Sequence, residues 1–447
     1  LSGAERGTLQ QVKSDAQRYR AVLDGYTDPV TLWMCAYHPE WGESGMSPKL
    51  QVSRFRVEDK EIVRLEDWND IVQRAISEWH PRVTTRRRMG VDPRTGMLYV
   101  ESTGGSKNAG AMAKTFDYLL RIDPDTGETG LVHLPFSADD FAIDDSGYLY
   151  LRACKLIGRY NLDTMREVPF DYGEERSGRA YSSGDRTAKM IAGIVLPGTR
   201  GTGWWEGGMG VNTHGQIVVV GGNDGKRGKY TAFQPPVYPG RKVAFSVMVF
   251  DKHGRVVQED AVQGVPEGYG VFIDNRGDIY YFAAGARLYE GDKTAMKGTG
   301  CVMKFKPGSG KLYASQGGRV PLSKDIPVKG LPRIDHRPNR VYAVDGAEWV
   351  FPGGGFAPVK SANVFPCLCW NSRFAIDHFG RSFVPQHLRD QVAVLDTNGN
   401  LIVQVGRYGN VDDGLPLHLS PYRDKRYPPR SMGGDEVALA YANYVGT

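Results

Sequence analysis

A short turn motif that recurs along the chain constrains its fold most strongly. It is clearest at 372–413, where Asp377-His378-Phe379-Gly380 and Asp396-Thr397-Asn398-Gly399 separate apolar runs. Asp, Asn and Gly tolerate the positive φ angles of tight turns, so such turns between apolar runs predict β-hairpins. Two successive hairpins predict one four-stranded antiparallel sheet here. We expect burial to alternate along 374–384 and 392–405, because successive side chains of a strand point to opposite faces.

The same turn occurs at four earlier positions, and each copy has a partner turn downstream. The earlier copies begin at Asp92, Asp144, Asn212 and Asp274, and their partners at Asp123, Asn161, Asp251 and Lys306. The long interval before Asp377 has room for a degenerate unit at 341–350, which brings the visible units to six. Repeated four-stranded units of about 40 to 50 residues with loop insertions are typical of β-propellers. We expect the first turns of all units to occupy equivalent positions in their sheets.

These residues resemble a known family. An apolar residue, Asp, two variable residues and Gly, followed by an apolar strand and a second Val-x-Asp-x-x-Gly turn, is similar to the repeat of NHL-type β-propellers. The closest copy is 374–406, and the resemblance covers 91–406. It implies an all-β fold of six or seven four-stranded antiparallel blades, which we place at 90–447 with long loop insertions. NHL-like propellers with long loops are frequently exported, so the resemblance also implies an extracytoplasmic location, periplasmic or secreted.

Residues 1–89 do not carry the repeat. Apolar residues spaced three or four apart predict amphipathic helices at 8–23 and 65–79, and an apolar run predicts a strand at 30–37. We therefore expect a partly helical N-terminal cap or a decorated first blade. The chain begins at Leu1 without an initiator Met or a signal-peptide profile, which favours a mature form after processing.

The other end of the chain, 436–445, has the pattern of the first strand or two of a further blade. A propeller closes by pairing its two chain ends within one blade, or it leaves a sheet edge open to a foreign strand. Two alternatives follow. Either the N-terminal strand completes the last blade, or the sequence is cut short within it. We also expect that a C-terminal edge strand left unpaired would be available for assembly with another chain.

Composition excludes some functions. The chain has 447 residues, 40% of them hydrophobic and 24% charged, as expected for one large propeller. Its net charge of +5 is spread over both signs, so a nucleic-acid partner lacks its usual electrostatic footprint. The sharpest basic cluster, Arg86-Arg87-Arg88, fits a solvated strand edge better than an anion site. Apolar runs fall short of the roughly 20 residues of a membrane span, so we predict no transmembrane segment.

The thiols provide the first candidate site. Cys367 and Cys369 form a Cys-x-Cys pair, with His378 and His387 downstream. Thiolates and imidazoles are ligands for zinc or copper. The spacing matches no standard metal motif, however, and two buried thiols or one disulfide to Cys301 or Cys154 is the favoured interpretation. Five cysteines are too few for a disulfide framework, and we predict no cofactor, with zinc or copper as the alternative.

The second candidate is the glycine-rich insertion at 201–210, which carries Trp204 and Trp205. Adjacent residues on a strand point to opposite faces, so we expect one indole to be exposed. With Arg200 and Glu206 beside it, an exposed Trp on a propeller rim can stack on a sugar ring or clamp a peptide. The alternative is a pair of indoles packed beneath their own loop.

The third candidate is a polar set, Arg381, His387, Arg389 and Asp390, on loops of the last full blade. Propeller-type lyases and lactonases use His or Tyr as a base and Arg to hold a carboxylate. A solvated loop is the simpler interpretation. The segment 123–128 lacks the spacing of a calcium loop and is interpreted as a turn. The chain carries no serine-nucleophile elbow, zincin motif or P-loop.

The sequence therefore predicts a recognition or assembly module that binds a carbohydrate or protein through its rim loops. Abundant repeat geometry without a catalytic motif favours this hypothesis over an enzyme. The first alternative is a carbohydrate-active enzyme of the lyase or lactonase type with its site at the propeller channel. The second is a structural subunit of a larger assembly.

Overall fold

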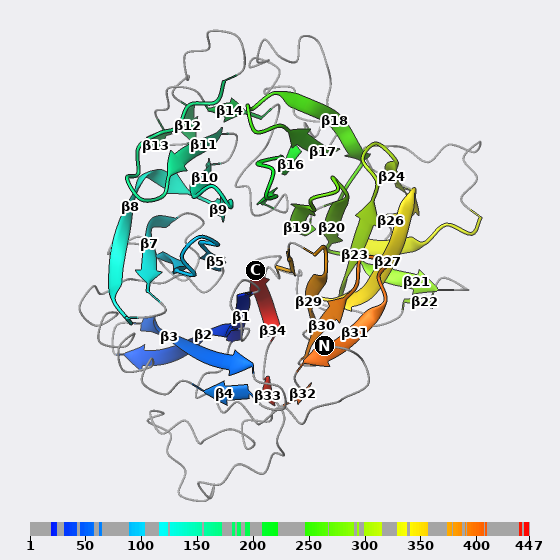
Figure 1. Cartoon of the computed structure of the whole chain (residues 1–447). Coiled ribbons are helices and arrows are strands. Elements are labelled where there is room, and N and C mark those ends of the chain that lie inside the picture. The colour runs from blue at the N-terminus through cyan, green and yellow to red at the C-terminus, as the bar shows by residue number, and fades with distance from the viewer. Residues whose placement is uncertain are drawn as a thin grey trace, which may run out of the picture. The chain divides into compact units, whose positions relative to one another are not determined.

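The computed structural model divides the chain into two compact units. Unit 1 comprises Leu1–His133, Arg373–Asp377 and Arg381–Thr447, and unit 2 comprises Leu134–Ser372 and His378–Gly380. The structure describes residues 19–24, 31–42, 45–57, 62–64, 89–102, 116–123, 126–153, 156–171, 181–183, 186–188, 193–196, 208–221, 246–266, 268–289, 293–294, 299–314, 329–337, 340–355, 373–377, 379–386, 389, 391–405, 407–408, 438–439 and 442–446. In these ranges the regular elements are β-strands, and none contains an α-helix (Figure 1). No described helix is long and apolar enough to cross a membrane.

The recurring turn is held together by its own Asp or Asn side chain. In the turn at Asp274, Oδ1 accepts the backbone N–H of Arg276 and of Asp278, each at 2.9 Å. Gly277 has a φ of +85°, a conformation that costs glycine little. The same pair of bonds forms in the turns at Asp144, Asn212, Asp251 and Asp396. The motif begins with Asp or Asn because its side-chain oxygen accepts the backbone N–H groups of the residues two and four positions later.

The first turns occupy equivalent positions, as the repeat predicts. Each connects the first two strands of its sheet, and its Asp or Asn is buried. The strand pairs are β5 (Met89–Val91) and β6 (Leu98–Ser102), β9 (Asp140–Ile143) and β10 (Tyr148–Ala153), β15 (Met209–Val211) and β16 (Ile217–Gly221), β19 (Gly268–Ile273) and β20 (Ile279–Ala283), and β28 (Ala375–Ile376) and β29 (Ser382–Gln386).

Unit 1 contains two four-stranded antiparallel sheets and one of five strands. The first sheet runs β5-β6-β7-β8, with β7 at Phe116–Ile122 and β8 at Thr129–Ala138, and β8 continues into unit 2. The second runs β28-β29-β30-β31, with β30 at Gln391–Leu395 and β31 at Leu401–Val405, and it confirms the four-stranded sheet predicted within 372–413.

The five-stranded sheet of unit 1 joins the two ends of the chain. Its order is β34-β1-β2-β3-β4, with strands at Ala442–Gly446, Tyr19–Asp24, Thr31–Gly42, Gly45–Val57 and Ile62–Arg64. The C-terminal strand β34 pairs in parallel with β1. Nearby, β32 (Arg407–Tyr408) and β33 (Ala438–Leu439) form a short parallel pair. Strand β2 covers residues 31–37 of the strand expected at 30–37.

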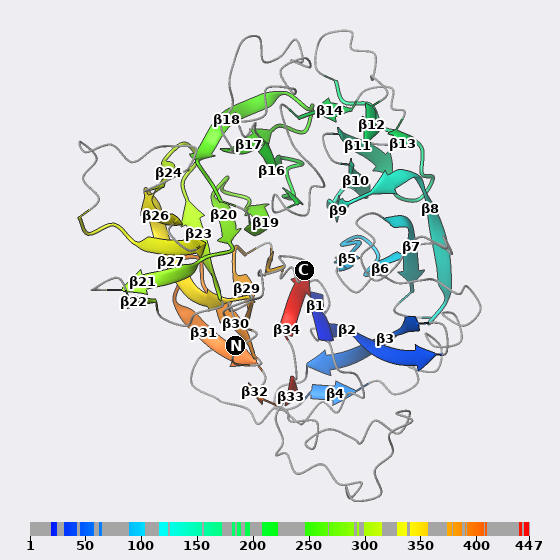
Figure 2. The same ribbon diagram turned by 180° about the vertical axis from the view of Figure 1, so that it is seen from behind.

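Unit 2 contains two four-stranded sheets and one large sheet. The first is β14-β11-β10-β9, with β11 at Leu156–Asn161 and β14 at Ile194–Val195. The second is β19-β20-β23-β27, with β23 at Gly300–Phe305 and β27 at Ala347–Gly354. The first strands β9, β15 and β19 lie side by side, which is the propeller-like arrangement of small sheets seen in Figures 1 and 2. A separate hairpin pairs β12 (Tyr181–Ser183) with β13 (Arg186–Ala188).

The large sheet of unit 2 has nine strands, and it corrects the expected number of blades. Its order is β15-β16-β17-β18-β24-β26-β25-β21-β22. The strands not yet defined are β17 (Ser246–Phe250), β18 (Val256–Gln263), β24 (Gly310–Ala314), β26 (Arg340–Asp345), β25 (Arg333–Arg337), β21 (Ala286–Tyr289) and β22 (Lys293–Thr294). The described residues thus form four separate four-stranded sheets, and six or seven such blades are not present among them.

The supposed unit at 341–350 is the reason for this difference. Its first half lies in β26 and pairs with β24, whereas its second half lies in β27 and pairs with β23 of another sheet. Gly346, with a φ of +73°, connects the two strands. A Cβ at this position would collide with the carbonyl oxygen of Ser309, so the close approach of the two chain segments requires glycine.

Two further expectations are wrong. Residues 19–23, expected at the end of a helix, lie in β1, because the backbone groups of this strand pair with β2 on one side and β34 on the other. The helix expected at 65–79 lies outside the described residues.

Burial does not alternate in the last sheet: β29 is buried on both faces, as is nearly all of β30, whereas β31 is exposed at Leu401, Ile402 and Val403. The inner strands of a sheet packed on both faces carry continuous apolar runs.

Candidate functional site

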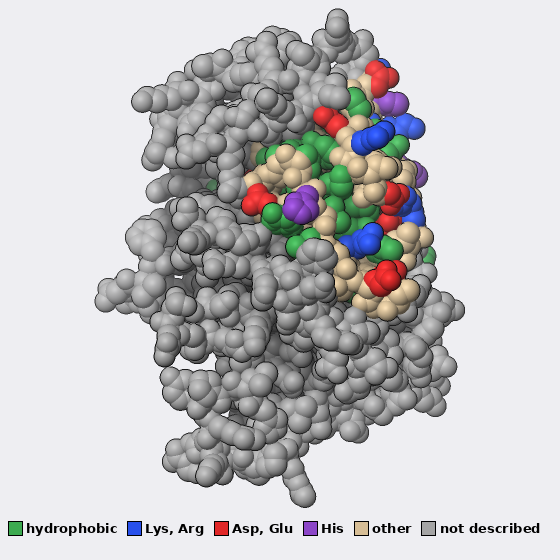
Figure 3. Space-filling model, turned by 90° about the vertical axis from the view of Figure 1, so that its left-hand side faces the viewer, with side chains coloured by type: hydrophobic (Ala, Val, Ile, Leu, Met, Phe, Trp, Pro, Cys, Tyr) green, Lys and Arg blue, Asp and Glu red, His purple; other side chains and the backbone are tan. Residues whose placement is uncertain are grey.

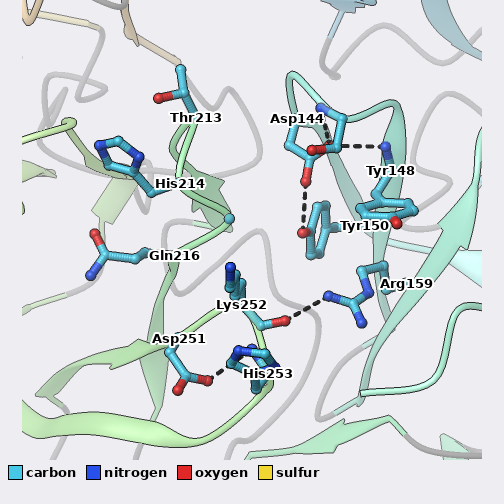
Figure 4. Close-up of a pocket in the computed structure, with 12 residues that line it drawn as sticks. Asp144, Tyr148, Tyr150, Arg159, Thr213, His214, Gln216, Asp251, Lys252 and His253 are labelled. Atoms are coloured by element: carbon cyan, nitrogen blue, oxygen red, sulfur yellow. Dashed lines mark hydrogen bonds between the residues drawn. The ribbon is translucent and has the colours of Figure 1, made fainter. Parts of the chain in front are cut away.

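Unit 2 contains an open cleft of about 710 Å³ between the turns of neighbouring sheets (Figure 4). One wall is the β9–β10 turn with the adjacent strands β10 and β11. The other wall is formed by the β15–β16 and β17–β18 turns. In an up-and-down sheet the first and third turns lie at the same end, which brings these turns together. The lining residues are Asp144, Ser146, Tyr148, Tyr150, Arg159, Thr213, His214, Gly215, Gln216, Asp251, Lys252 and His253.

Asp144 and Tyr150 form a buried pair on the first wall. Oδ1 of Asp144 accepts the backbone N–H of Ser146 and of Tyr148, each at 2.9 Å, and Oδ2 accepts the Tyr150 hydroxyl at 2.9 Å. Burial raises the pKa of Tyr150, and the Asp144 carboxylate raises it further, so the phenol stays neutral and acts as a donor. The carboxylate therefore has three donors before any ligand arrives.

Arg159 crosses the cleft from β11 to the opposite wall. Its Nη1 donates to the carbonyl oxygen of Lys252 at 2.6 Å, and its Nη2 and Nε donate to the carbonyl oxygens of Pro169 at 3.0 Å and Val168 at 3.3 Å. The guanidinium also lies 5.2 Å from the Tyr148 ring centre and 4.5 Å from that of Phe170. Such cation–π contacts and three carbonyl bonds fix the position of this positive charge.

The β15–β16 turn is anchored to the next sheet. Asn212 Nδ2 donates to the carbonyl oxygen of Asp274 at 3.0 Å and to Oε1 of Gln216 at 2.8 Å. Thr213 Oγ1 donates to Oδ1 of Asn275 at 2.7 Å. His214, next along the turn, is exposed at the cleft. The turn is therefore rigid at its base and presents an imidazole to solvent.

The β17–β18 turn provides the remaining charges. Oδ1 of Asp251 accepts the backbone N–H of His253 and of Arg255, each at 2.9 Å. Lys252 and His253 are exposed at the cleft. The bond from Arg159 to the Lys252 carbonyl holds this turn against the first wall (Figure 4). On the molecular face in Figure 3, too, acidic and basic side chains are interspersed, and the described residues there form no patch of one sign.

The expected metal ligands cannot be placed. Cys367, Cys369, His378 and His387 lie outside the described residues, and so does Cys154. Within the described ranges no group of three His, Cys, Asp or Glu residues could hold a metal ion. Cys301 is a free thiol in β23, and complete burial raises its pKa to about 12. A neutral buried thiol packs as a small apolar residue.

The tryptophan loop also lies outside the described residues, from Arg200 to Gly207, and this includes Trp204, Trp205 and Glu206. Its last described residues enter β15. Buried Arg152 donates from Nη1 to the carbonyl oxygen of Gly208 at 2.5 Å, and the Met209 N–H donates to Oδ2 of Asp140 at 2.7 Å. These bonds attach the end of the insertion to the neighbouring sheet.

The two arginines of the third candidate set have different surroundings. Arg381 bonds within its own turn, with Nε 2.6 Å from Oδ2 of Asp377 and its backbone N–H 2.9 Å from Oδ1. Arg389 is exposed. Neither lines the cleft of unit 2.

Sequence reasoning missed the cleft because it treated the turns only as connections. Two of them, Asn212-Thr213-His214-Gly215 and Asp251-Lys252-His253-Gly254, carry His immediately before the turn glycine. The turn does not need histidine at this position, so its recurrence in two turns was the signal available in the sequence. Arg159 had no such signal, since its bond across the cleft is to Lys252, 93 residues away.

Comparisons with known proteins find likeness only at the level of structure. No family model and no curated protein matches the sequence. Virginiamycin B lyase from Staphylococcus aureus has a TM-score of 0.36 at 8% identity, covering 88% of this chain and 86% of that chain. BamB from Moraxella catarrhalis has a TM-score of 0.33 at 11% identity, covering 89% of this chain and 90% of that chain. A gluconolactonase from Xanthomonas campestris has a TM-score of 0.32 at 12% identity, covering 72% of this chain and 75% of that chain. Scores this low assign neither a family nor an activity to this chain.

Proposed function

We propose that the protein is a recognition module whose ligand binds in the cleft of unit 2. The observation that carries this proposal is that the polar side chains of the cleft stand on turns fixed by their own Asp or Asn bonds. Functional groups on short loops held by a rigid scaffold lose little freedom on binding, which favours affinity. The cleft is also open, as a site for an extended ligand requires.

The tryptophan loop is proposed as a second contact surface. It enters β15 at Gly208, at the end of the strand opposite the Asn212 turn. Trp204 and Trp205, with Arg200 and Glu206, are the residues proposed to contact a carbohydrate or protein partner there. An extracytoplasmic location suits such a module and is part of this proposal.

A carbohydrate-active enzyme is the alternative function. Two exposed imidazoles, His214 and His253, share the cleft with the carboxylate of Asp251, and these are group types used in acid–base chemistry. If the protein converts a bound sugar to product and His214→Ala abolishes this activity, the enzyme function would be established. The structural-subunit alternative concerns β34, which pairs with β1 on one side and, among the described strands, is the edge of that sheet on the other.

A ligand screen tests the recognition proposal. The full chain would be screened by thermal shift against panels of oligosaccharides and peptides, and each hit repeated with His214→Ala and Lys252→Ala. We expect both variants to abolish the shift, while Lys329→Ala, an exposed lysine outside the cleft, retains it. Hits that bind the cleft variants as tightly as the parent protein would overturn the proposal.

A further inference from the structure

We infer that the cleft selects a hydroxylated carboxylic acid, such as a uronic acid unit of a glycan, and that Arg159 anchors its carboxylate. This inference rests on the proposed binding function of the same cleft. It follows from three features of the lining residues: a fixed guanidinium with an unused donor, carboxylates that already accept hydrogen bonds from the protein, and neutral polar groups suited to hydroxyls.

The guanidinium of Arg159 is fixed but not saturated. Arginine has five N–H donors, and the described residues accept three of them through the carbonyl oxygens of Lys252, Pro169 and Val168. The Tyr150 hydroxyl is a further hydrogen-bond partner of the guanidinium, which leaves one N–H donor for a ligand. Because the side chain is held by both walls, it needs no reordering when an anion arrives. A bond from this donor to a carboxylate is charge-assisted, and such bonds are stronger than neutral ones.

The two aspartates of the cleft, Asp144 and Asp251, already accept hydrogen bonds from other parts of the protein. Asp144 is buried, and both of its oxygens are bonded, by two backbone N–H groups and the Tyr150 hydroxyl. On Asp251, Oδ1 accepts two backbone N–H groups. Lys252 is exposed on the same turn and makes no side-chain bond among the described residues. A ligand therefore meets two cations, and carboxylates that already accept hydrogen bonds from the protein.

The rest of the lining suits hydroxyl groups. Gln216 accepts one bond at Oε1 from Asn212, which leaves its Nε2 as a donor. Thr213 Oγ1 donates its proton to Asn275 and keeps its acceptor lone pairs. Asp251 Oδ2 has no bond to a described residue and can accept a hydroxyl proton. Donors and acceptors mixed beside a cationic fork favour a sugar acid over an acidic peptide, which carries few hydroxyls.

Calorimetry with the full chain and three probes tests the inference. The probes are trigalacturonate, its carboxyl-reduced neutral counterpart and a tri-glutamate peptide, at low salt. We expect trigalacturonate to bind at least about 10-fold more tightly than either of the others. Arg159→Gln should weaken its binding by about 10- to 100-fold while leaving the neutral probe unchanged, as expected for loss of a charge-assisted bond.

Two further variants separate charge from structure. Lys252→Gln should reduce the preference for trigalacturonate over its neutral counterpart. Because Lys252 is exposed, this variant should fold, so it tests the inference also in the case that Arg159→Gln does not fold. Arg166→Gln, an exposed arginine outside the cleft, is the matched control and should bind like the parent protein.

The outcomes are distinct. Equal binding of acidic and neutral trimers, lost together in His214→Ala, would overturn the acid preference while the cleft remained a binding site. Preference for tri-glutamate would identify a peptide site instead of a sugar site and also overturn the inference. Absence of trigalacturonate binding at millimolar concentration would refute it outright, whereas trimer binding that no cleft variant alters would refute the recognition proposal as well.

Discussion

The hydroxyl of Tyr150 donates a 2.9 Å hydrogen bond to Oδ2 of Asp144, six residues earlier in the chain. Tyr280 repeats this contact with Asp274 at 3.1 Å in another sheet. In both sheets the tyrosine lies on the second strand and the aspartate begins the first turn. The pair therefore joins the turn to its strand, and in the first case it forms part of a cleft wall.

Replacing Tyr150 by Phe should lower the free energy of unfolding by about 1 to 3 kcal/mol, because a buried carboxylate oxygen loses its donor. Denaturant titration measures this change. Tyr148→Phe is the matched control. Its ring is half-buried and its hydroxyl makes no bond among the described residues, so we expect a change below about 0.5 kcal/mol. Equal effects of the two variants would contradict the role assigned to the Tyr150 hydroxyl.

Stability should fall in alkaline solution. Burial raises the pKa values of Tyr150, Tyr160 and Tyr280, and nearby carboxylates raise them further. The stabilisation is thus complete below about pH 10, where unfolded tyrosines ionise, and is lost above it at about 1.4 kcal/mol per pH unit for each tyrosine.

Denaturant titrations between about pH 9 and pH 11 would measure this slope, and ultraviolet absorbance of tyrosinate would follow ionisation. Tyr150→Phe should make the slope shallower. A folded protein in which all tyrosines ionise near pH 10 would disprove the expectation.

Met165→Gly should stabilise the protein. Met165 has a φ of +54° in the turn that begins at Asn161, at the position where the turns at Asp92 and Asp123 have Gly96 and Gly127. A left-handed conformation costs a non-glycine residue about 1 to 2 kcal/mol, partly offset by the greater flexibility of glycine in the unfolded chain. We expect a net gain of about 0.5 to 1 kcal/mol by denaturant titration.

The converse substitution provides the control for that experiment. Gly147→Ala, at a φ of +78°, should destabilise by a similar amount. A loss of stability in Met165→Gly would mean that packing of the methionine side chain outweighs the backbone strain.

Asp278→Asn should destabilise unit 2 by about 3 kcal/mol. Asp278 lies 2.9 Å from the ammonium of Lys304, which is 4% exposed, so its loss leaves a buried charge undercompensated. Lys306→Ala is the control. That ammonium is 2.8 Å from Asp278 but 55% exposed, and surface ion pairs contribute at most about 1 kcal/mol.

The same pair should show an acid dependence. Burial by itself raises the pKa of Asp278, but its bonds to Lys306 and Lys304 outweigh burial and hold the pKa below its ordinary value. Its contribution is therefore present above about pH 4 and is lost as the pH falls further. Denaturant titrations at pH 3 and pH 6 should differ less for Asp278→Asn than for the parent protein.

Sequence reasoning predicted the features that bonds between neighbouring residues determine, and it failed where distant strand partners decide the structure. The hairpins at Asp377 and Asp396 were predicted correctly because the side-chain bonds that hold their turns are local, to a residue four positions later at Asp377 and to residues two and four positions later at Asp396. The segment at 341–350 was misplaced because either half is a plausible strand, and only the partners available to it assign β26 and β27 to different sheets. The helix expected to end at Leu23 failed for the same reason, since pairing of β1 with β2 and β34 overrides its apolar spacing.

The amino-acid sequence by itself determined the all-β character of this protein and the equivalent first turns of its sheets, because Asp, Asn and Gly act on their immediate neighbours. Only the tertiary structure decided the cleft. Arg159 bonds to the carbonyl oxygen of Lys252, 93 residues away, and Thr213 bonds to Asn275, 62 residues away. Contacts across such separations depend on how whole sheets pack, and no spacing between residues in the chain records them.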